Sequence, residues 1–339
     1  MSASIEMDHI DQQILDILQK EFPLVSRPFA ALANNLSITE EDLISRIRFL
    51  LYEKKIIREI SAIFDSKRLG YESCLVAMQI PPDRLDAAAA LINEHPGVSH
   101  NYSRSHTLSL WFTIAIPNGH NLRHEVNKLG EMVSATATLL LPSLRMFKLG
   151  VRLDITGTRD PLSMENEQRN KSADPKDEIM PDLTEKDIKI IRELQKNIPL
   201  MITPFKEIAG RINIPEEELF DAIGKMMKQG RIRRFAAVLR HRDMGFKANA
   251  MGVWIVPPED IVRTGTHLAR FQSVTHCYER PACPPLWPYN LYTMVHTRTR
   301  NECIFILQKM SEEAGIKEYH YLFSEKEYKK ARVRYFKEQ

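Results

Sequence analysis

Three short stretches near the N-terminus carry apolar residues at the three- and four-residue spacing of an α-helix. The second stretch opens at Pro28, and the third follows Thr39 in the order Thr-Glu-Glu-Asp; both are typical helix starts. Three short helices in succession predict a helix-turn-helix unit. The apolar positions that this spacing places on one side are Ile10, Ile14, Leu15, Ile17, Leu18, Leu43, Ile47 and Leu50.

The hydrophobic period changes after residue 53. Residues 53–64 carry β-branched side chains in partial alternation, and residues 65–70 end in glycine, which predicts the two-stranded wing of a winged helix. Further strands are predicted at 73–80, 98–102, 109–116 and 135–141, and helices at 84–93 and 121–132. This βαββαβ order predicts an α+β fold, a ferredoxin-like sheet covered by helices on one face.

The whole pattern occurs twice in the chain. Residues 11–24 match residues 187–200 at an offset of 176, and Pro28-Phe29 matches Pro204-Phe205 at the same offset. A His-x-Tyr-x-Arg motif that starts at His100 recurs at His276. Such self-similarity indicates two homologous halves in one polypeptide.

Residues 156–182 separate the halves. This segment has no aromatic residue, several Pro and Gly, and charges of both signs, so it is predicted to be a linker. The second half repeats the first, with a wing at 231–239, a first strand at 248–256 and a longer loop at 281–288. The predicted units are winged helix-turn-helix domains at 1–72 and 183–247, ferredoxin-like domains at 73–155 and 248–339, and the linker at 156–182. We expect the halves to pack through their sheets as an internal pseudo-dimer, which leaves a further homo-oligomer open.

The composition narrows the function classes. With 47 Lys and Arg against 44 Asp and Glu, the net charge is only +3, far from the strong positive field typical of nucleic-acid binders. The chain has no long apolar run and its start lacks the pattern of a signal peptide, so a soluble, cytoplasmic protein without a membrane partner is expected. The four cysteines form no Cys-x-x-Cys pair, so neither a zinc site nor a disulfide framework is indicated.

The predicted order of domains resembles the Lrp/AsnC family of amino-acid-responsive transcription regulators. That resemblance implies DNA binding through the third helix of each unit. The first turns of these helices, Glu40 to Asp42 and Glu216 to Glu218, are acidic, and phosphates repel carboxylates at the entrance to the groove. Acidic residues are also simply favourable at a helix N-terminus. A DNA-binding regulator therefore stays the alternative interpretation.

The predicted sheet domains contain a cluster of His, Tyr, Arg and Trp that DNA binding does not explain. Here the chain resembles the siroheme decarboxylases, which are built from two Lrp-like subunits. Segments 63–71 and 110–113 are similar to the A-type subunit. Segments 232–235, 239–241, 245–246, 249–251 and 287–291 look like the B-type subunit. The resemblance covers nearly all of the chain except the linker.

The two halves also differ from each other and from the family pattern. Ser109 stands where the A-type strand is expected to have Asn, and Glu59 stands where the second half has Phe235. The second half has the pair Arg233-Arg234 and the longer aromatic loop. We therefore expect the second half to hold the working site, with the first half as its scaffold.

The resemblance implies a carboxy-lyase of haem or haem d1 biosynthesis that removes carbon dioxide from two acetate side chains of siroheme, giving 12,18-didecarboxysiroheme. No cofactor is expected, because the tetrapyrrole itself accepts the electrons and carries the iron. No metal site of the protein's own is expected either, although a histidine could ligate the substrate iron. A His is suited to proton donation and Arg to carboxylate binding.

Each candidate also has an ordinary explanation, as a core residue, a solvated turn or simple packing. The candidate catalytic residues are His276, His241 and Tyr278. The candidate substrate-binding residues are Arg233, Arg234, Arg240, Arg280, Trp287, Tyr289, Asn290, His296, His100, Tyr102 and Arg104.

Overall fold

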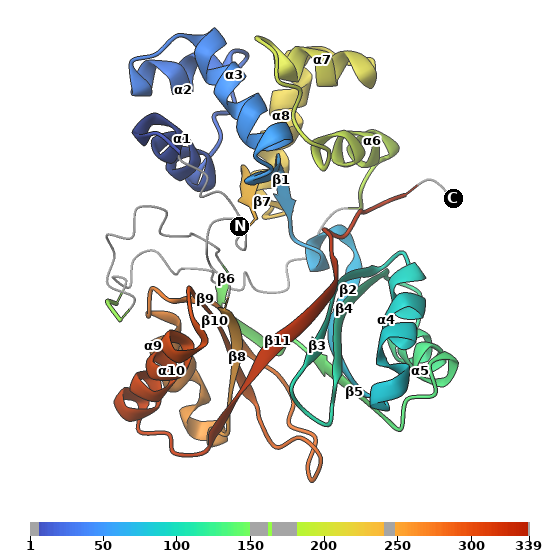
Figure 1. Cartoon of the computed structure of the whole chain (residues 1–339). Helices are drawn as coiled ribbons and strands as arrows, with labels where there is room; N and C mark the ends of the chain where they lie inside the picture. The colour runs from blue at the N-terminus through green and yellow to red at the C-terminus, as the bar shows by residue number, and fades with distance from the viewer. Residues whose placement is uncertain (1–6, 150–161, 165–181, 241–247, 338–339) are drawn as a thin grey trace.

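The structure is a computed structural model that describes residues 7–149, 162–164, 182–240 and 248–337. Figure 1 shows two layers: the helix-turn-helix units lie side by side in one layer, and the two halves of a β-sheet lie in the other. No helix within those ranges has the length and apolar character needed to cross a membrane.

The predicted helix-turn-helix units are confirmed in both halves. Thr39 caps the third helix by accepting the backbone N–H of Asp42 at 3.1 Å, and Leu43, Ile47 and Leu50 are buried as the spacing predicted. The helices are α1 (His9–Lys20), α2 (Pro28–Leu36) and α3 (Glu40–Arg48) in the first half, and α6 (Glu185–Leu194), α7 (Pro204–Arg211) and α8 (Glu216–Lys228) in the second.

The two predicted wings are wrong in their pairing. Among the described residues each half supplies one strand, and β1 (Ile57–Phe64) pairs antiparallel with β7 (Ile232–Leu239) of the other half. A single strand would leave its backbone groups unpaired, and pairing across the halves satisfies them. This β1–β7 ribbon shares one hydrophobic core with both sets of helices, so the two helix-turn-helix units form one body.

In the ribbon, equivalent positions of the two halves differ by another number of residues than in the helices before it. In the first half a π-helical turn, Phe49–Glu53, follows α3, whereas α8 continues as a regular helix; a π turn accommodates one extra residue. The irregular pairs at the two ends of the ribbon are Ile57–Leu239 and Phe64–Ile232. Ile57 is thus equivalent to Ile232, an offset of 175 rather than 176.

This register corrects one sequence comparison. Arg58 corresponds to Arg233, and Glu59 corresponds to Arg234 rather than to Phe235. Asp65 corresponds to Arg240, and their backbone N–H groups make matching hydrogen bonds to the opposite strand, at 2.9 and 2.8 Å. The ribbon therefore carries charges of opposite sign at two pairs of equivalent positions.

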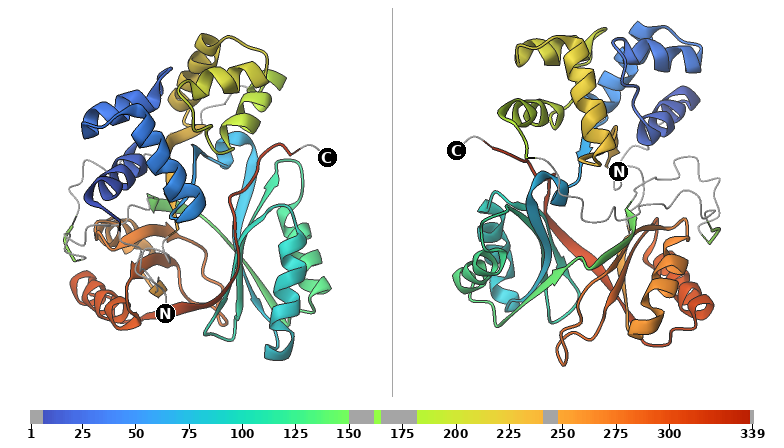
Figure 2. Two further views of the ribbon diagram at one scale, coloured as in Figure 1. Left: turned by 45° about the horizontal axis from the view of Figure 1, so that its top comes forward. Right: turned by 180° about the vertical axis from the view of Figure 1, so that it is seen from behind.

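The ferredoxin-like order is confirmed in each half. The first half has β2 (Tyr71–Gln79), α4 (Leu85–Glu94), β3 (Val98–Arg104), β4 (Leu110–Pro117), α5 (Leu122–Met132) and β5 (Ala137–Pro142). The second has β8 (Ala248–Trp254), α9 (Ile261–Ala269), β9 (Val274–Glu279), β10 (Leu291–Thr297), α10 (Arg300–Ala314) and β11 (Tyr319–Lys330). Figures 1 and 2 show the helices of each half on the outer face of its own strands.

The halves pack through their sheets as predicted, and they also exchange strands. The long strand β11 pairs first with β8 and then with β3 of the other half. The short strand β6 (Arg145–Leu149) follows β5 and pairs with β9. The result is a nine-stranded sheet in the order β5-β2-β4-β3-β11-β8-β10-β9-β6. A separate apolar core that includes Trp111 and Trp287 lies between the inner faces.

Residues 331–337, which follow β11, run from the sheet to the β1–β7 ribbon and its helices. After β11, the backbone N–H of Ala331 donates to the Ser99 carbonyl at 2.6 Å. Gln195 at the end of α6 then holds Tyr335 through two hydrogen bonds, at 2.9 and 3.0 Å. This carboxy-terminal tail, residues 331–337, therefore ties the two layers together.

Candidate active site

The two His-x-Tyr-x-Arg motifs occupy equivalent strands. His100 and Tyr102 lie on β3 with stacked rings, their centroids 6.3 Å apart at 26°. His276 and Tyr278 on β9 repeat this at 6.2 Å and 28°. Side chains two residues apart on a strand project to the same face, so the predicted grouping of each motif is confirmed.

The arginine of each motif is anchored to a backbone carbonyl. Arg104 donates to the Leu322 carbonyl on β11 at 3.0 Å, and Arg280 donates to the Leu141 carbonyl on β5 at 2.5 Å. Arg280 also lies over the Tyr278 ring, 4.9 Å from its centroid. Burial lowers the pKa of Arg104 to about 10, so this side chain remains charged at neutral pH.

Both motif histidines are neutral at physiological pH. Burial, together with the charges of Arg280 and Lys148, lowers the pKa of His276 to about 4. Burial lowers the pKa of His100 to about 3, with further contributions from Arg58, Lys330 and His276 itself. Arg58 of the ribbon and His276 of the other half both act on His100, so the first motif faces the ribbon and lies within electrostatic range of the second.

These shifts predict a pH dependence of stability. In the unfolded chain a histidine titrates near pH 6.5, so between pH 6.5 and about 4 the unfolded state binds more protons than the folded state. The free energy of unfolding should therefore decrease as the pH falls through this window, and these two groups should have no effect above it. Urea unfolding at pH 7.5 and 5.5 measures the decrease. An unchanged decrease in His276→Asn would contradict the assignment.

Arg233 joins the second motif, as predicted. It forms an ion pair with Asp65 at 2.7 Å and contacts the Met146 sulfur at 3.5 Å. Burial raises the pKa of Tyr278, and the charges of Arg280 and Arg233 oppose that rise. The β1–β7 ribbon therefore brings a cation to the phenol from the opposite layer.

The other ribbon arginines lie elsewhere. Arg234 donates a 3.5 Å hydrogen bond to the Gln19 carbonyl, and burial lowers its pKa. Arg240 is exposed at the end of β7. His241 lies outside the described residues, so its predicted role stays a prediction.

The aromatic loop places its three candidate residues differently: Trp287 is buried, whereas Tyr289 and Asn290 are partly exposed. Trp287 is fully buried between the sheets, with its ring 5.1 Å from that of Trp111, so it has no free face on which a ligand could stack. Asn290 uses both ends of its amide on the backbone of Val256, at 2.9 and 2.7 Å. These two residues shape the loop, and Tyr289 packs against Trp287 at 4.9 Å.

His296 lies on β10, where it pairs with Asn249 of β8. Within the described ranges, no group of three or more His, Cys, Asp or Glu side chains is arranged to hold a metal ion.

Four charged residues near the motifs were missed by the sequence analysis: Arg58, Asp65, Lys148 and Lys330. Two of them are on strands that cross from the other half, so only the strand exchange brings them near a motif. No local pattern in the sequence marked Arg58, because its equivalence to Arg233 follows from the ribbon register.

Comparisons with known proteins decide the family. A model described as the siroheme decarboxylase NirDL-like HTH domain matches residues 11–58 and 187–233. A model described as the AsnC-like ligand binding domain matches residues 68–148 and 243–329. Siroheme decarboxylase of Hydrogenobacter thermophilus is 38% identical over 96% of this chain and 95% of its own length. The chain belongs to the siroheme decarboxylase family.

Members of the family also occur as separate subunits. The beta subunit of Methanosarcina barkeri is 47% identical over 44% of this chain and 97% of its own length. The crystal structure of the siroheme decarboxylase NirDL matches with a TM-score of 0.73 at 34% identity, covering 97% of this chain and 95% of that one. The predicted relationship to fused decarboxylase subunits is confirmed.

Proposed function

We propose that the protein is a carboxy-lyase that removes carbon dioxide from two acetate side chains of siroheme, giving 12,18-didecarboxysiroheme for haem or haem d1 biosynthesis. The observation that carries the proposal is the relationship to a siroheme decarboxylase over 96% of the chain. A NirDL structure of the same fold was determined with an iron-uroporphyrin III analogue. The paired motifs supply the histidines and cations that such a substrate requires.

The reaction balances without an oxidant or reductant. The bond between the acetate methylene and its carboxylate breaks, carbon dioxide leaves, and the electron pair stays with the side-chain carbon and the conjugated ring. That carbon then takes up one proton and becomes a methyl group. The protein therefore has to bind carboxylates and deliver one proton for each acetate, and the proposed chemistry uses no cofactor beyond the substrate's own ring.

His276 is suited to deliver that proton once substrate is present. Its pKa of about 4 keeps it neutral in the free protein. A substrate carboxylate next to the His276 imidazole favours its charged form and raises its pKa towards neutrality. Substrate binding therefore protonates His276. The hydroxyl of Thr275, 2.9 Å from Nδ1, orients the ring. The Tyr278 hydroxyl remains the second candidate donor.

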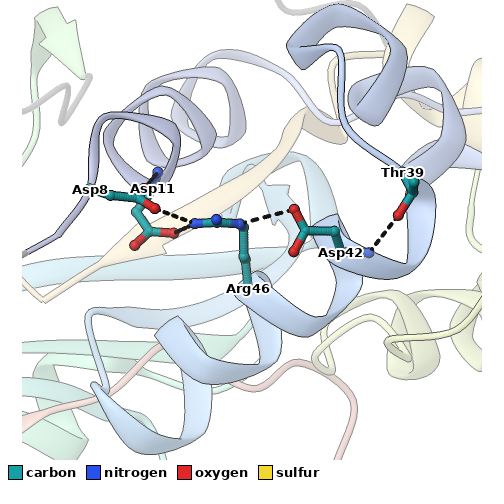
Figure 3. Close-up of polar contacts among 5 residues, drawn as sticks. All are labelled: Asp8, Asp11, Thr39, Asp42 and Arg46. Atoms are coloured by element: carbon teal, nitrogen blue, oxygen red, sulfur yellow. Dashed lines mark hydrogen bonds and ion pairs between the residues drawn. The ribbon is translucent and has the colours of Figure 1, made fainter.

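The first helix-turn-helix unit offers little to DNA. Arg46 on α3 is held by three carboxylates, Asp8 at 2.7 Å, Asp11 at 2.9 Å and Asp42 at 3.1 Å (Figure 3). Glu40 at the start of α3 is buried and paired with Arg27. The acidic first turn of α3 therefore remains where phosphates would approach, and the two arginines paired with it, Arg27 and Arg46, are already neutralised.

Anaerobic incubation with siroheme, followed by mass analysis, tests the proposal. We expect a mass loss of one carbon dioxide for each of two acetates, with no added cofactor. Tight binding and a shifted absorption spectrum without mass loss would indicate a tetrapyrrole carrier instead. Unchanged siroheme together with a defined footprint on duplex DNA would favour a regulator.

A further inference from the structure

Cations gather beneath the ribbon on the side of His100. Glu59 on β1 is buried and is the carboxylate in this group, and two arginines of the carboxy-terminal tail bind it, Arg332 at 2.7 Å and Arg334 at 3.4 Å. Arg332 also interacts electrostatically with Arg58 and Arg234. Arg332 thus lies near three other guanidinium groups and one carboxylate.

The tail delivers its arginines to this place because of the strand exchange. Lys330, the last residue of β11, pairs with His100 on β3. The chain then rises from the sheet, and Arg332 donates to the Ser61 hydroxyl on β1 at 2.8 Å. The sheet motif, the tail and the underside of the ribbon therefore meet within a few residues of His100.

Among the described residues, Arg58 is the one arginine of this group whose side chain has neither a hydrogen bond nor an ion pair, since Arg234 donates to the Gln19 carbonyl. The Arg58 side chain is half-buried. Its equivalent in the other half, Arg233, is neutralised by Asp65 at 2.7 Å. The residue equivalent to Asp65 on the Arg58 side is Arg240, a second cation. The same position in the fold is therefore neutral on one side and positive on the other.

Such an excess of positive charge is unfavourable in a partly desolvated place unless an anion joins it. Glu59 cannot supply the missing charge, because Arg332 and Arg334 already share it. Guanidinium groups bind carboxylates with two parallel hydrogen bonds. The ligand that fits Arg58 is thus a carboxylate.

We propose that Arg58 binds a side-chain carboxylate of an anionic tetrapyrrole, next to a group of cations that Glu59 and the carboxy-terminal tail hold in place. The identity of the ligand rests on the proposed function. The two halves then have different roles. The first half binds substrate carboxylates at Arg58, and the second half transfers the proton at His276.

Titration with iron-uroporphyrin III, followed by its absorption spectrum, tests this inference in the full chain. Arg58→Gln should raise the Kd by about tenfold or more, since a charged hydrogen bond is lost. Arg58→Lys should retain part of the affinity, and the salt dependence of Kd should weaken in Arg58→Gln. The matched control is Arg263→Gln on α9, whose side chain is exposed and pairs only with Asp260.

The outcomes separate the inference from the proposed function. An unchanged Kd in a folded Arg58→Gln protein, as judged by its thermal unfolding, overturns the inference even if the wild-type protein decarboxylates siroheme. A weaker Kd in Arg58→Gln, in a wild-type protein that leaves siroheme intact, supports the carboxylate site and overturns the decarboxylase proposal. An equal loss in Arg263→Gln would show a general effect of surface charge and would also overturn the inference.

Discussion

Replacing His276 with alanine should lower the rate of siroheme decarboxylation by about 100-fold or more, because the proton for the departing acetate's carbon would have to come from water. His276→Gln should be as slow, since an amide cannot carry the proton. The Kd for iron-uroporphyrin III should change little in both variants. Single-turnover kinetics with mass analysis measure the rate. The matched control is His124→Ala on the exposed face of α5, which should retain the wild-type rate.

The equivalent change in the first half should have a smaller effect. Burial and the charges of Arg58 and Lys330 keep the pKa of His100 low, and the two arginines of the carboxy-terminal tail add positive charge on this side. A carboxylate must therefore overcome more positive charge to load a proton onto His100. If His100→Ala were inactive while His276→Ala kept the full rate, the proton donor would be in the first half and the assignment of the two sides would be reversed.

Local patterns predicted the parts of this protein whose structure depends on neighbouring residues. The helical spacing of Leu43, Ile47 and Leu50 placed α3 correctly, because burial on one side of a helix repeats every three or four residues. The period of two in each His-x-Tyr-x-Arg motif likewise predicted that its side chains share one face, and the stacked rings confirm it.

Pairing between distant strands could not be predicted in the same way. The alternation in β1 indicates a strand, but nothing in that segment indicates that its partner is β7 rather than a second strand of its own wing. The extra residue in the π-helical turn before β1 was equally invisible, although it decides that Arg58 matches Arg233. The charges around His100 depend on both features, so the sequence alone could not place Arg58 beside the first motif.

Trp287 could either pack in the core or stack on the ligand, and the structure places it in the core. Trp287→Ala should therefore lower the free energy of unfolding by about 3–5 kcal/mol. Its ring packs against those of Trp111 and Tyr289, and its indole N–H donates to the Tyr292 hydroxyl at 2.6 Å. Trp287→Phe keeps most of the apolar volume but loses that hydrogen bond, so a smaller loss of about 1–3 kcal/mol is expected. Urea unfolding measures both values. A Trp287→Phe protein of unchanged stability that bound iron-uroporphyrin III more weakly would instead support the stacking role that the sequence suggested, because only a residue in contact with the ligand changes affinity without changing the core.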